Sequence, residues 1–193
     1  MSDFWVKAIL KEDRGWTEAG IKRFLGKPDK TATNPHYKCA SAMCLYKKER
    51  VKQVESTADF KAWQERSVKR RKAALDAAET KKRNLLNTVQ SWSIDVPVLP
   101  MNEVRRLAVD HYNNWEGNYE VASLKDSEAD FLNRITVNYI RHQLTIYDDS
   151  NRWMSGKVGK DEAYYTNRHR VFDAIAHSYP KLSKECKLQD QLS

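Results

Sequence analysis

Residues 56–91 constrain the fold more than any other part of the chain. They consist mainly of strong helix formers, and Ser56 followed by Asp59 resembles a capping box in which Asp replaces Glu. We therefore predict one helix of about thirty residues over this stretch. Its apolar positions are sparse: Phe60, Trp63, Ala74, Ala78, Leu85 and Val89. Because clusters of Lys and Arg lie between them, we expect much of this helix to be exposed to solvent.

The net charge of +8 is distributed unevenly. Lys and Arg outnumber Asp and Glu by 21 to 11 in residues 1–94, whereas the numbers are 13 and 15 in residues 95–193. This asymmetry indicates that the N-terminal half faces a polyanion, for which nucleic acid is the leading candidate. A membrane surface is disfavoured, because the candidate helices need their apolar faces to form a core.

The distribution of apolar residues and cysteines predicts the compartment. The absence of a long apolar run predicts neither a signal peptide nor a transmembrane span, and hence a cytoplasmic protein, or a nuclear one in a eukaryote. Three cysteines form no even disulfide framework, which fits a reducing environment. His36, Cys39 and Cys44 lack the second Cys/His pair of a structural zinc site, so we predict no metal. We also expect no cofactor, because no phosphate-binding loop or dinucleotide turn is evident.

The N-terminal residues predict a small helical head. Thr17 is a suitable N-cap for a short helix that ends at Leu25, because Gly26 and Pro28 terminate helices. Residues 29–41 have the composition of a loop with Asn34 near its tip. Residues 43–46 are predicted to form a short strand or a buried elbow.

Two prolines in residues 95–100 prevent helix propagation and predict the domain boundary. The predicted domains are residues 1–94, a basic lobe with the long helix, and residues 95–193, a helical bundle. We expect three helices in the second lobe. The first is capped by Asn102, has Val104, Leu107, His111 and Trp115 facing inward, and ends at residues 113–117. The others span residues 127–147 and 161–177, and Asp148 to Asn151 would end the former.

Part of the N-terminal sequence resembles known DNA-binding modules. Residues 24–28, 34–36 and 43–46, followed by basic residues, resemble the DNA-binding domain of the xeroderma pigmentosum group A repair protein. More loosely, they resemble the helix, wing and helix order of MerR and excisionase winged helices. The resemblance covers residues 16–72, without the four-cysteine zinc module of the repair protein. It implies a winged-helix-like N-terminal lobe with the long basic helix. Together with the helical bundle predicted for residues 95–193, this gives a mainly α protein.

The resemblance implies which residues contact nucleic acid. The expected phosphate contacts come from the first helix, the segment after Tyr46 and the long helix: Lys22, Arg23, Lys27, Lys47, Lys48, Arg50, Lys52, Lys69, Arg70, Arg71 and Lys72. The side chains suited to base edges or stacking are Arg23, Asn34, His36 and Tyr37. The predicted function is non-enzymatic binding of nucleic acid, with duplex DNA preferred over RNA. The helical lobe would bind a protein partner or itself. A merely solvated basic surface is the alternative.

Two Arg–His pairs in the second lobe leave a nuclease as an alternative. Arg106 and His111 have the Arg-x4-His spacing of HEPN-type ribonucleases, although His111 also lies on a predicted apolar stripe. Arg141 and His142 lie within one helical turn of Asn138 and Thr145, so this polar cluster could face a cleft or a partner. A buried network that ties the bundle together is the preferred interpretation. A metal-independent nuclease or toxin-like effector would use one of these pairs. A scaffold protein is the third possibility, although the sparse apolar stripe argues against an extended coiled coil.

Overall fold

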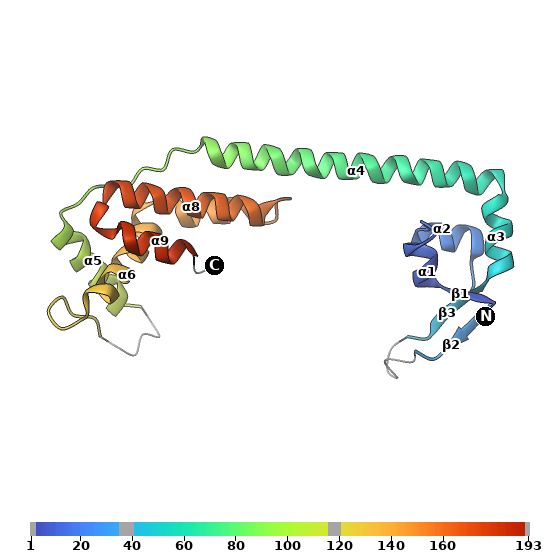
Figure 1. Ribbon diagram of the computed structural model, residues 1–193, viewed down its shortest axis with the longest axis horizontal. Helices are drawn as coiled ribbons and strands as arrows, with labels where there is room; N and C mark the ends of the chain where they lie inside the picture. The colour runs from blue at the N-terminus through green and yellow to red at the C-terminus, as the bar shows by residue number, and fades with distance from the viewer. Residues whose placement is uncertain (1–2, 35–40, 116–120, 192–193) are drawn as a thin grey trace. The chain divides into compact units, whose positions relative to one another are not determined.

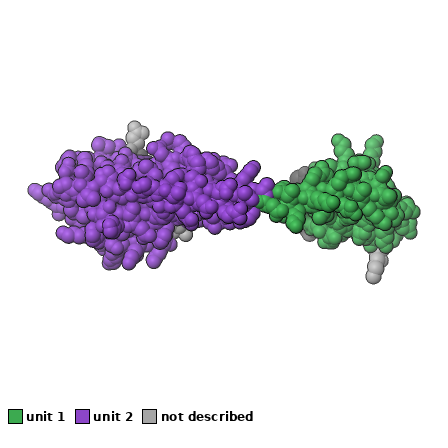
Figure 2. Space-filling view, turned by 90° about the horizontal axis from the view of Figure 1, so that it is seen from above, with its two compact units in different colours: residues 1–76 green, residues 77–193 purple. Residues whose placement is uncertain are grey.

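The computed structural model describes residues 3–34, 41–115 and 121–191 (Figure 1). The protein is mainly helical, as predicted. The chain divides into two compact units, Met1–Asp76 and Ala77–Ser193, which Figure 2 distinguishes by colour. No helix within the described ranges has both the length and the apolar character needed to cross a bilayer.

Unit 1 combines short helices with a small sheet. Its elements in chain order are β1 (Phe4–Val6), α1 (Lys7–Glu12), α2 (Glu18–Gly20), η1 (Ile21–Leu25), β2 (Lys30–Ala32), β3 (Met43–Lys47), α3 (Lys48–Ser56) and the first part of α4 (Ala58–Ser91). The strands form an antiparallel sheet in the order β1-β3-β2. Trp5 pairs with Tyr46, and Thr31 pairs with Cys44. The central strand β3 is thus hydrogen-bonded to a neighbouring strand on each side.

The predicted helical head is confirmed, with one local departure from α-helical geometry. The Thr17 side chain accepts a hydrogen bond from the Gly20 amide at 3.1 Å, as an N-cap should. After Gly20 the helix continues as the π-helical turn η1, and Gly26 ends it with a φ of +61°. Residues 43–46 form a strand rather than an elbow, and β2 lies inside the segment predicted to be a loop.

Aromatic rings form the centre of the unit 1 core. The ring centroids of Trp16 and Phe60 are 4.3 Å apart, and those of Phe60 and Trp63 are 5.3 Å apart. Phe24 meets Phe60 edge-on at 5.4 Å. Aliphatic and phenolic side chains complete this core: Leu10, Ile21, Leu25, Tyr46 and Val51. Since Phe60 and Trp63 belong to α4, the start of the long helix is an integral part of unit 1.

The predicted long helix is confirmed as α4, but its cap is different. Thr57, not Ser56, accepts the hydrogen bond from the Phe60 amide, whereas the Ser56 hydroxyl donates to the carbonyl of Gln53. The helix therefore begins one residue later than the capping-box pattern indicated. Ala74, one of its sparse apolar positions, is exposed in the middle of α4.

Unit 2 is a set of packed helices. Its elements after α4 are α5 (Met101–Asn113), α6 (Ala129–Tyr139), η2 (Ile140–Leu144), α7 (Tyr147–Met154), α8 (Lys160–Ser178), η3 (Pro180–Leu182) and α9 (Ser183–Gln191). α5 packs against α6, and α8 packs against α9 (Figure 1). Their buried side chains include Val104, Val137, Ile140, Phe172 and Ile175.

Several details of the predicted bundle require correction. The predicted helix over residues 127–147 is interrupted by the π-helical turn η2, and Asp148 to Asn151 lie in α7 instead of ending a helix. α5 begins at Met101 without a side-chain cap from Asn102. Trp115 lies beyond the end of α5 and is 64% exposed, contrary to its predicted inward position. α8 matches its prediction closely, whereas α9 was not predicted.

The boundary between the units differs from the predicted one. It lies between Asp76 and Ala77, inside α4, and the proline segment at residues 95–100 is attached to unit 2. The Tyr179 hydroxyl donates to the carbonyl of Pro97 at 2.7 Å and accepts from the Leu99 amide at 2.9 Å. Val96 and Leu99 also pack against the unit 2 core. The helix has already ended at Ser91, and the proline segment packs on unit 2.

Candidate nucleic-acid interface

Most of the predicted phosphate-contacting side chains are exposed. Lys22 and Arg23 lie on η1, Lys27 follows it, and Lys47 ends β3. The other exposed members are Lys52 on α3 and Lys69, Arg70, Arg71 and Lys72 on α4. Within the described residues, none of these nine cations forms an ion pair with a carboxylate. They are therefore available to an external anion, apart from Arg71, which donates to the carbonyl of Gly15 at 3.2 Å. Lys48 is half-buried, with its ammonium 5.8 Å from the centre of the Trp5 ring.

Arg50 is directed into the fold instead. Its guanidinium pairs with Asp29 at 3.0 Å and also donates to the carbonyl oxygens of Lys27, at 3.3 Å, and of Leu25. These carbonyls lie at the C-terminal end of η1, where helix carbonyls lack intrahelical partners. Arg50 thus ties α3 to the end of η1 and to the loop that follows. Burial raises the pKa of Asp29, but hydrogen bonds from the Lys47 amide and from Arg50 outweigh it and lower that pKa overall.

A second internal ion pair was not predicted from the sequence. Arg14 donates to both carboxylate oxygens of Glu55, and the Trp16 indole donates to Oε1 of Glu55 at 2.9 Å. The guanidinium also lies 4.1 Å from the centre of the Trp5 ring. Arg14 and Glu55 are 41 positions apart, and neither belongs to a recognisable motif. Only the folded chain brings them together.

These contacts divide the cations of unit 1 into two classes. Arg14 and Arg50 hold the fold together, whereas Lys22, Lys47 and Lys52 extend into solvent. The whole of the net charge also belongs to this unit. Lys and Arg number 18 against 10 Asp and Glu in residues 1–76, and 16 against 16 in residues 77–193.

The residues predicted to read bases are only partly described. Arg23 is exposed, and its guanidinium lies 5.0 Å from the centre of the Phe24 ring. Asn34 is half-buried and already takes part in an interaction within the protein. His36 and Tyr37 lie outside the described residues, as does Cys39 of the metal ligands considered above.

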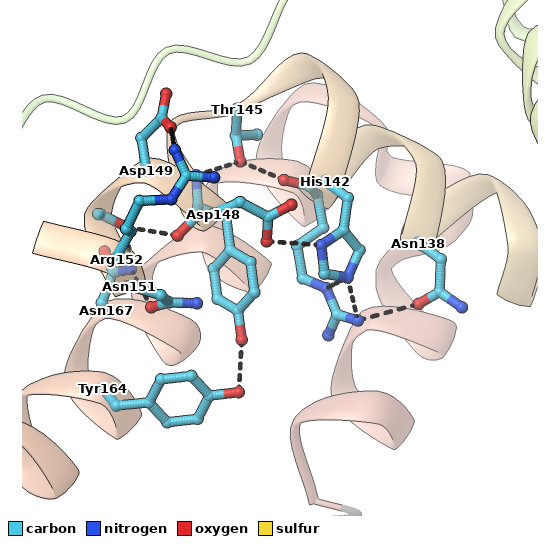
Figure 3. A network of polar contacts seen from close by, with 12 residues as sticks. Asn138, His142, Thr145, Asp148, Asp149, Asn151, Arg152, Tyr164 and Asn167 are labelled. Carbon is cyan, nitrogen blue, oxygen red and sulfur yellow. Dashed lines mark hydrogen bonds and ion pairs between the residues drawn. The ribbon is translucent and has the colours of Figure 1, made fainter. Parts of the chain in front are cut away.

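In unit 2 the structure brings one of the two Arg–His pairs together. Arg141 donates to Nε2 of His142 from Nε at 3.1 Å and from Nη2 at 2.9 Å. The other ring nitrogen, Nδ1, lies 2.8 Å from Asp148. Figure 3 shows the His142 ring between Asp148 and the guanidinium that also contacts Asn138. Thr145 does not join this face, because its hydroxyl donates to the carbonyl of Arg141.

This geometry limits the chemistry of His142. Since Nε2 accepts from Arg141, the proton of the neutral ring lies on Nδ1 and is donated to Asp148. The only lone pair able to accept a proton is therefore already occupied. Arg106 pairs with Asp110 at 2.9 Å on the surface of α5, whereas His111 packs edge-on against Tyr139. The structure does not bring Arg106 and His111 into one site.

A neighbouring set of polar groups, on α7 and α8, has a structural role. The hydroxyls of Tyr147 and Tyr164 are 2.7 Å apart, and Asn167 donates to Ser150 at 2.7 Å (Figure 3). Burial, together with the bond to Tyr164, raises the pKa of Tyr147 to about 12. These contacts join α7 to α8, as expected of a buried network that ties a bundle together.

Comparison of the chain with protein-family models, with curated proteins and with solved structures found no match.

Proposed function

We propose that unit 1 binds nucleic acid, with duplex DNA as the preferred target, and that the protein acts as a non-enzymatic accessory or regulatory factor. The observation that carries the proposal is the set of unpaired cations on η1, β3 and α3. Each phosphate neutralised by such a side chain releases a condensed counterion, which favours binding without any base contact.

The order of elements supports duplex DNA. α1 and the continuous α2–η1 helix are joined by a short turn, and the β2–β3 hairpin follows them. Two helices and a hairpin in this order agree with the resemblance to winged helices. In helix-turn-helix proteins the second helix enters the major groove. Here that helix bears Lys22 and Arg23 on its exposed surface, and Lys27 follows it.

The nuclease alternative has less support. A general base needs a free lone pair within reach of the proton that it removes. His142 presents none, because Arg141 occupies Nε2. We therefore propose no catalytic function for the Arg141–His142 pair.

The test is fluorescence anisotropy of the full-length protein with labelled duplex DNA, single-stranded DNA and RNA over a salt series. The informative variant combines Lys22→Ala, Arg23→Ala and Lys27→Ala. Its matched control removes the same number of charges from exposed positions of η3 and α9 in unit 2: Lys181→Ala, Lys184→Ala and Lys187→Ala.

We expect the wild-type protein to bind duplex DNA most tightly, with affinity that falls steeply as salt increases. The unit 1 variant should reduce the slope of log K against log salt by about 3, since each phosphate contact contributes about 0.9. The control should change it by less than about 1. Equal slopes for the variant and its control would exclude the proposed interface.

A further inference from the structure

A pocket of about 300 Å³ lies in unit 2, at the junction of α5, α6 and η2. Part of its wall is aromatic and is formed by Tyr112, Trp115 and Tyr139. The His111 ring stands edge-on to both Trp115 and Tyr139, with centroid distances of 6.0 and 5.6 Å. The volume and the aromatic lining suit a small ligand with a flat ring.

Arg141 belongs to the polar part of this wall, which also includes Asn138, His142, Gln143 and Asp148. It is a half-buried cation without a carboxylate partner. Within the described residues it forms no ion pair, and its Nη1 donates to no neighbour. Its partners are the neutral acceptors His142 and Asn138, and its guanidinium lies 5.1 Å from the Tyr147 ring. Arg168, also half-buried, differs because it has Asp190 at 3.8 Å.

A partly desolvated charge is costly unless an opposite charge compensates it. Burial is the main cause that lowers the pKa of Arg141, which reflects the same cost. The Tyr147 ring offsets part of this desolvation cost through its cation–π contact with the guanidinium. It supplies no hydrogen-bond acceptor to Nη1. An anion that enters the pocket would supply the missing acceptor, since guanidinium groups bind carboxylates and phosphates through parallel hydrogen bonds.

We propose that this pocket binds a small anion, an aromatic carboxylate or phosphate ester, whose charged group meets Arg141 and whose ring packs against Trp115 and Tyr139. Asn138 fixes the guanidinium from one side and the His142–Asp148 pair fixes it from the other. The site lies wholly within unit 2, so it does not depend on nucleic-acid binding by unit 1.

Asp148 lines the same pocket and opposes an anion. Its charge is only partly offset by the hydrogen bond from Nδ1 of His142. Asp148 is exposed to solvent, which screens this repulsion. Removal of the carboxylate should therefore strengthen binding, whereas removal of the guanidinium should weaken it.

The test uses NMR titration of the ¹⁵N-labelled full-length protein at constant ionic strength, with the Trp115 indole N–H as reporter. Two charged aromatic probes, benzoate and phenyl phosphate, distinguish carboxylate binding from phosphate binding. Two further compounds serve as controls. Benzamide keeps the ring without the charge, and acetate keeps the charge without the ring. We expect at least one charged aromatic probe to bind with a Kd on the order of 1 mM, as its size allows.

Benzamide and acetate should each bind about tenfold more weakly, because each lacks one half of the recognition. Arg141→Met should lose about tenfold in affinity, and Arg106→Met, its exposed control, should lose none. Asp148→Asn should gain about twofold. If Arg141→Met does not fold, Trp115→Ala decides the question, with the backbone amides of η2 as reporters in place of the indole. Trp115 is exposed, and its loss should make benzoate no better than acetate.

The proposal is overturned if benzamide binds as well as the charged probes. It is equally overturned if none of the probes moves the Trp115 resonance, or if Arg141→Met folds and binds like the wild type.

Discussion

Gly20 lies directly against the indole ring of Trp63, which α4 contributes to the unit 1 core. A Cβ atom at position 20 would overlap the ring carbons Cζ2 and Cη2 of Trp63. The absence of a side chain at position 20 is therefore what allows α2 and the start of α4 to pack together.

We expect Gly20→Ala to destabilise unit 1 by about 2 kcal/mol, because the added methyl group must displace the ring from a packed core. Ala19→Ser, at the exposed neighbouring position, is the control and should cost less than about 0.5 kcal/mol. Hydrogen exchange of unit 1 amides in the full-length protein measures the loss. Trp63→Leu should reduce the cost of Gly20→Ala, and an additive double mutant would contradict the direct contact.

Glu55 should make the stability of unit 1 sensitive to acid. Burial raises the pKa of Glu55, but the hydrogen bonds from Arg14 and Trp16 outweigh it and lower that pKa below its ordinary value of 4.5. A lowered pKa means that the stabilisation is complete above the ordinary value and is lost as the pH falls through the folded-state value.

Glu55→Gln should therefore cost about 2 kcal/mol at pH 7, and the difference from wild type should shrink below pH 4.5. Glu49→Gln, on the exposed face of α3, is the matched control. Chemical denaturation monitored by tryptophan fluorescence at pH 7, 5 and about 3 covers this window. A difference that stays constant through acid would contradict the proposed role of the ionised carboxylate.

Arg50 should behave as a structural residue and not as a phosphate contact. Lys at this position keeps the charge but lacks the planar set of donors that reaches Leu25, Lys27 and Asp29. Arg50→Lys should destabilise unit 1 by about 1.5 kcal/mol, whereas Lys52→Ala, at an exposed position of the same helix, should be nearly neutral. Thermal unfolding compares the two. Equal melting temperatures for both variants would show that Arg50 belongs with the exposed basic residues.

His169 should hold α9 more firmly at low pH than at high pH. Its hydrogen bond to Asp190, at 2.6 Å, is the main cause that raises the pKa of His169, and Asp173 adds to it. A raised pKa stabilises the fold fully below the ordinary value of 6.5, and this stabilisation is lost as the pH rises through the folded-state value.

Because His169 is 64% exposed, solvent screening limits the effect to about 0.5 kcal/mol. His169→Gln should therefore increase hydrogen exchange in α9 about twofold at pH 6 and have little effect at pH 9. His177→Gln, exposed at the end of α8, is the control. An effect of His169→Gln that grows with increasing pH would show that the assigned charge state is wrong.

Local signals in the sequence were sufficient to predict several helices. Thr17 and Gly26 delimit the first helical head because N-caps and left-handed glycines act within one turn of the chain. The composition of residues 56–91 likewise predicted α4, and the pattern of residues 161–177 predicted α8. Sparse apolar positions correctly indicated that much of α4 is exposed.

The interruptions of regular structure were not predictable in this way. The π-helical turn η2 changes which side chains face the core without any glycine or proline to signal it. The proline segment at residues 95–100 is not helical, as its chemistry requires, but its assignment to unit 2 depends on Tyr179, which lies about 80 positions away.

What the sequence determined by itself is the helical character of this protein, its capped segments and the concentration of positive charge in one half, because these depend on neighbouring residues and on composition. Tertiary structure alone decided which cations are free. Arg14 and Arg50 find their carboxylates 41 and 21 positions away, whereas Lys22 and Lys27 find none among the described residues. Pairing across such distances follows from how the core packs, and no local pattern encodes it.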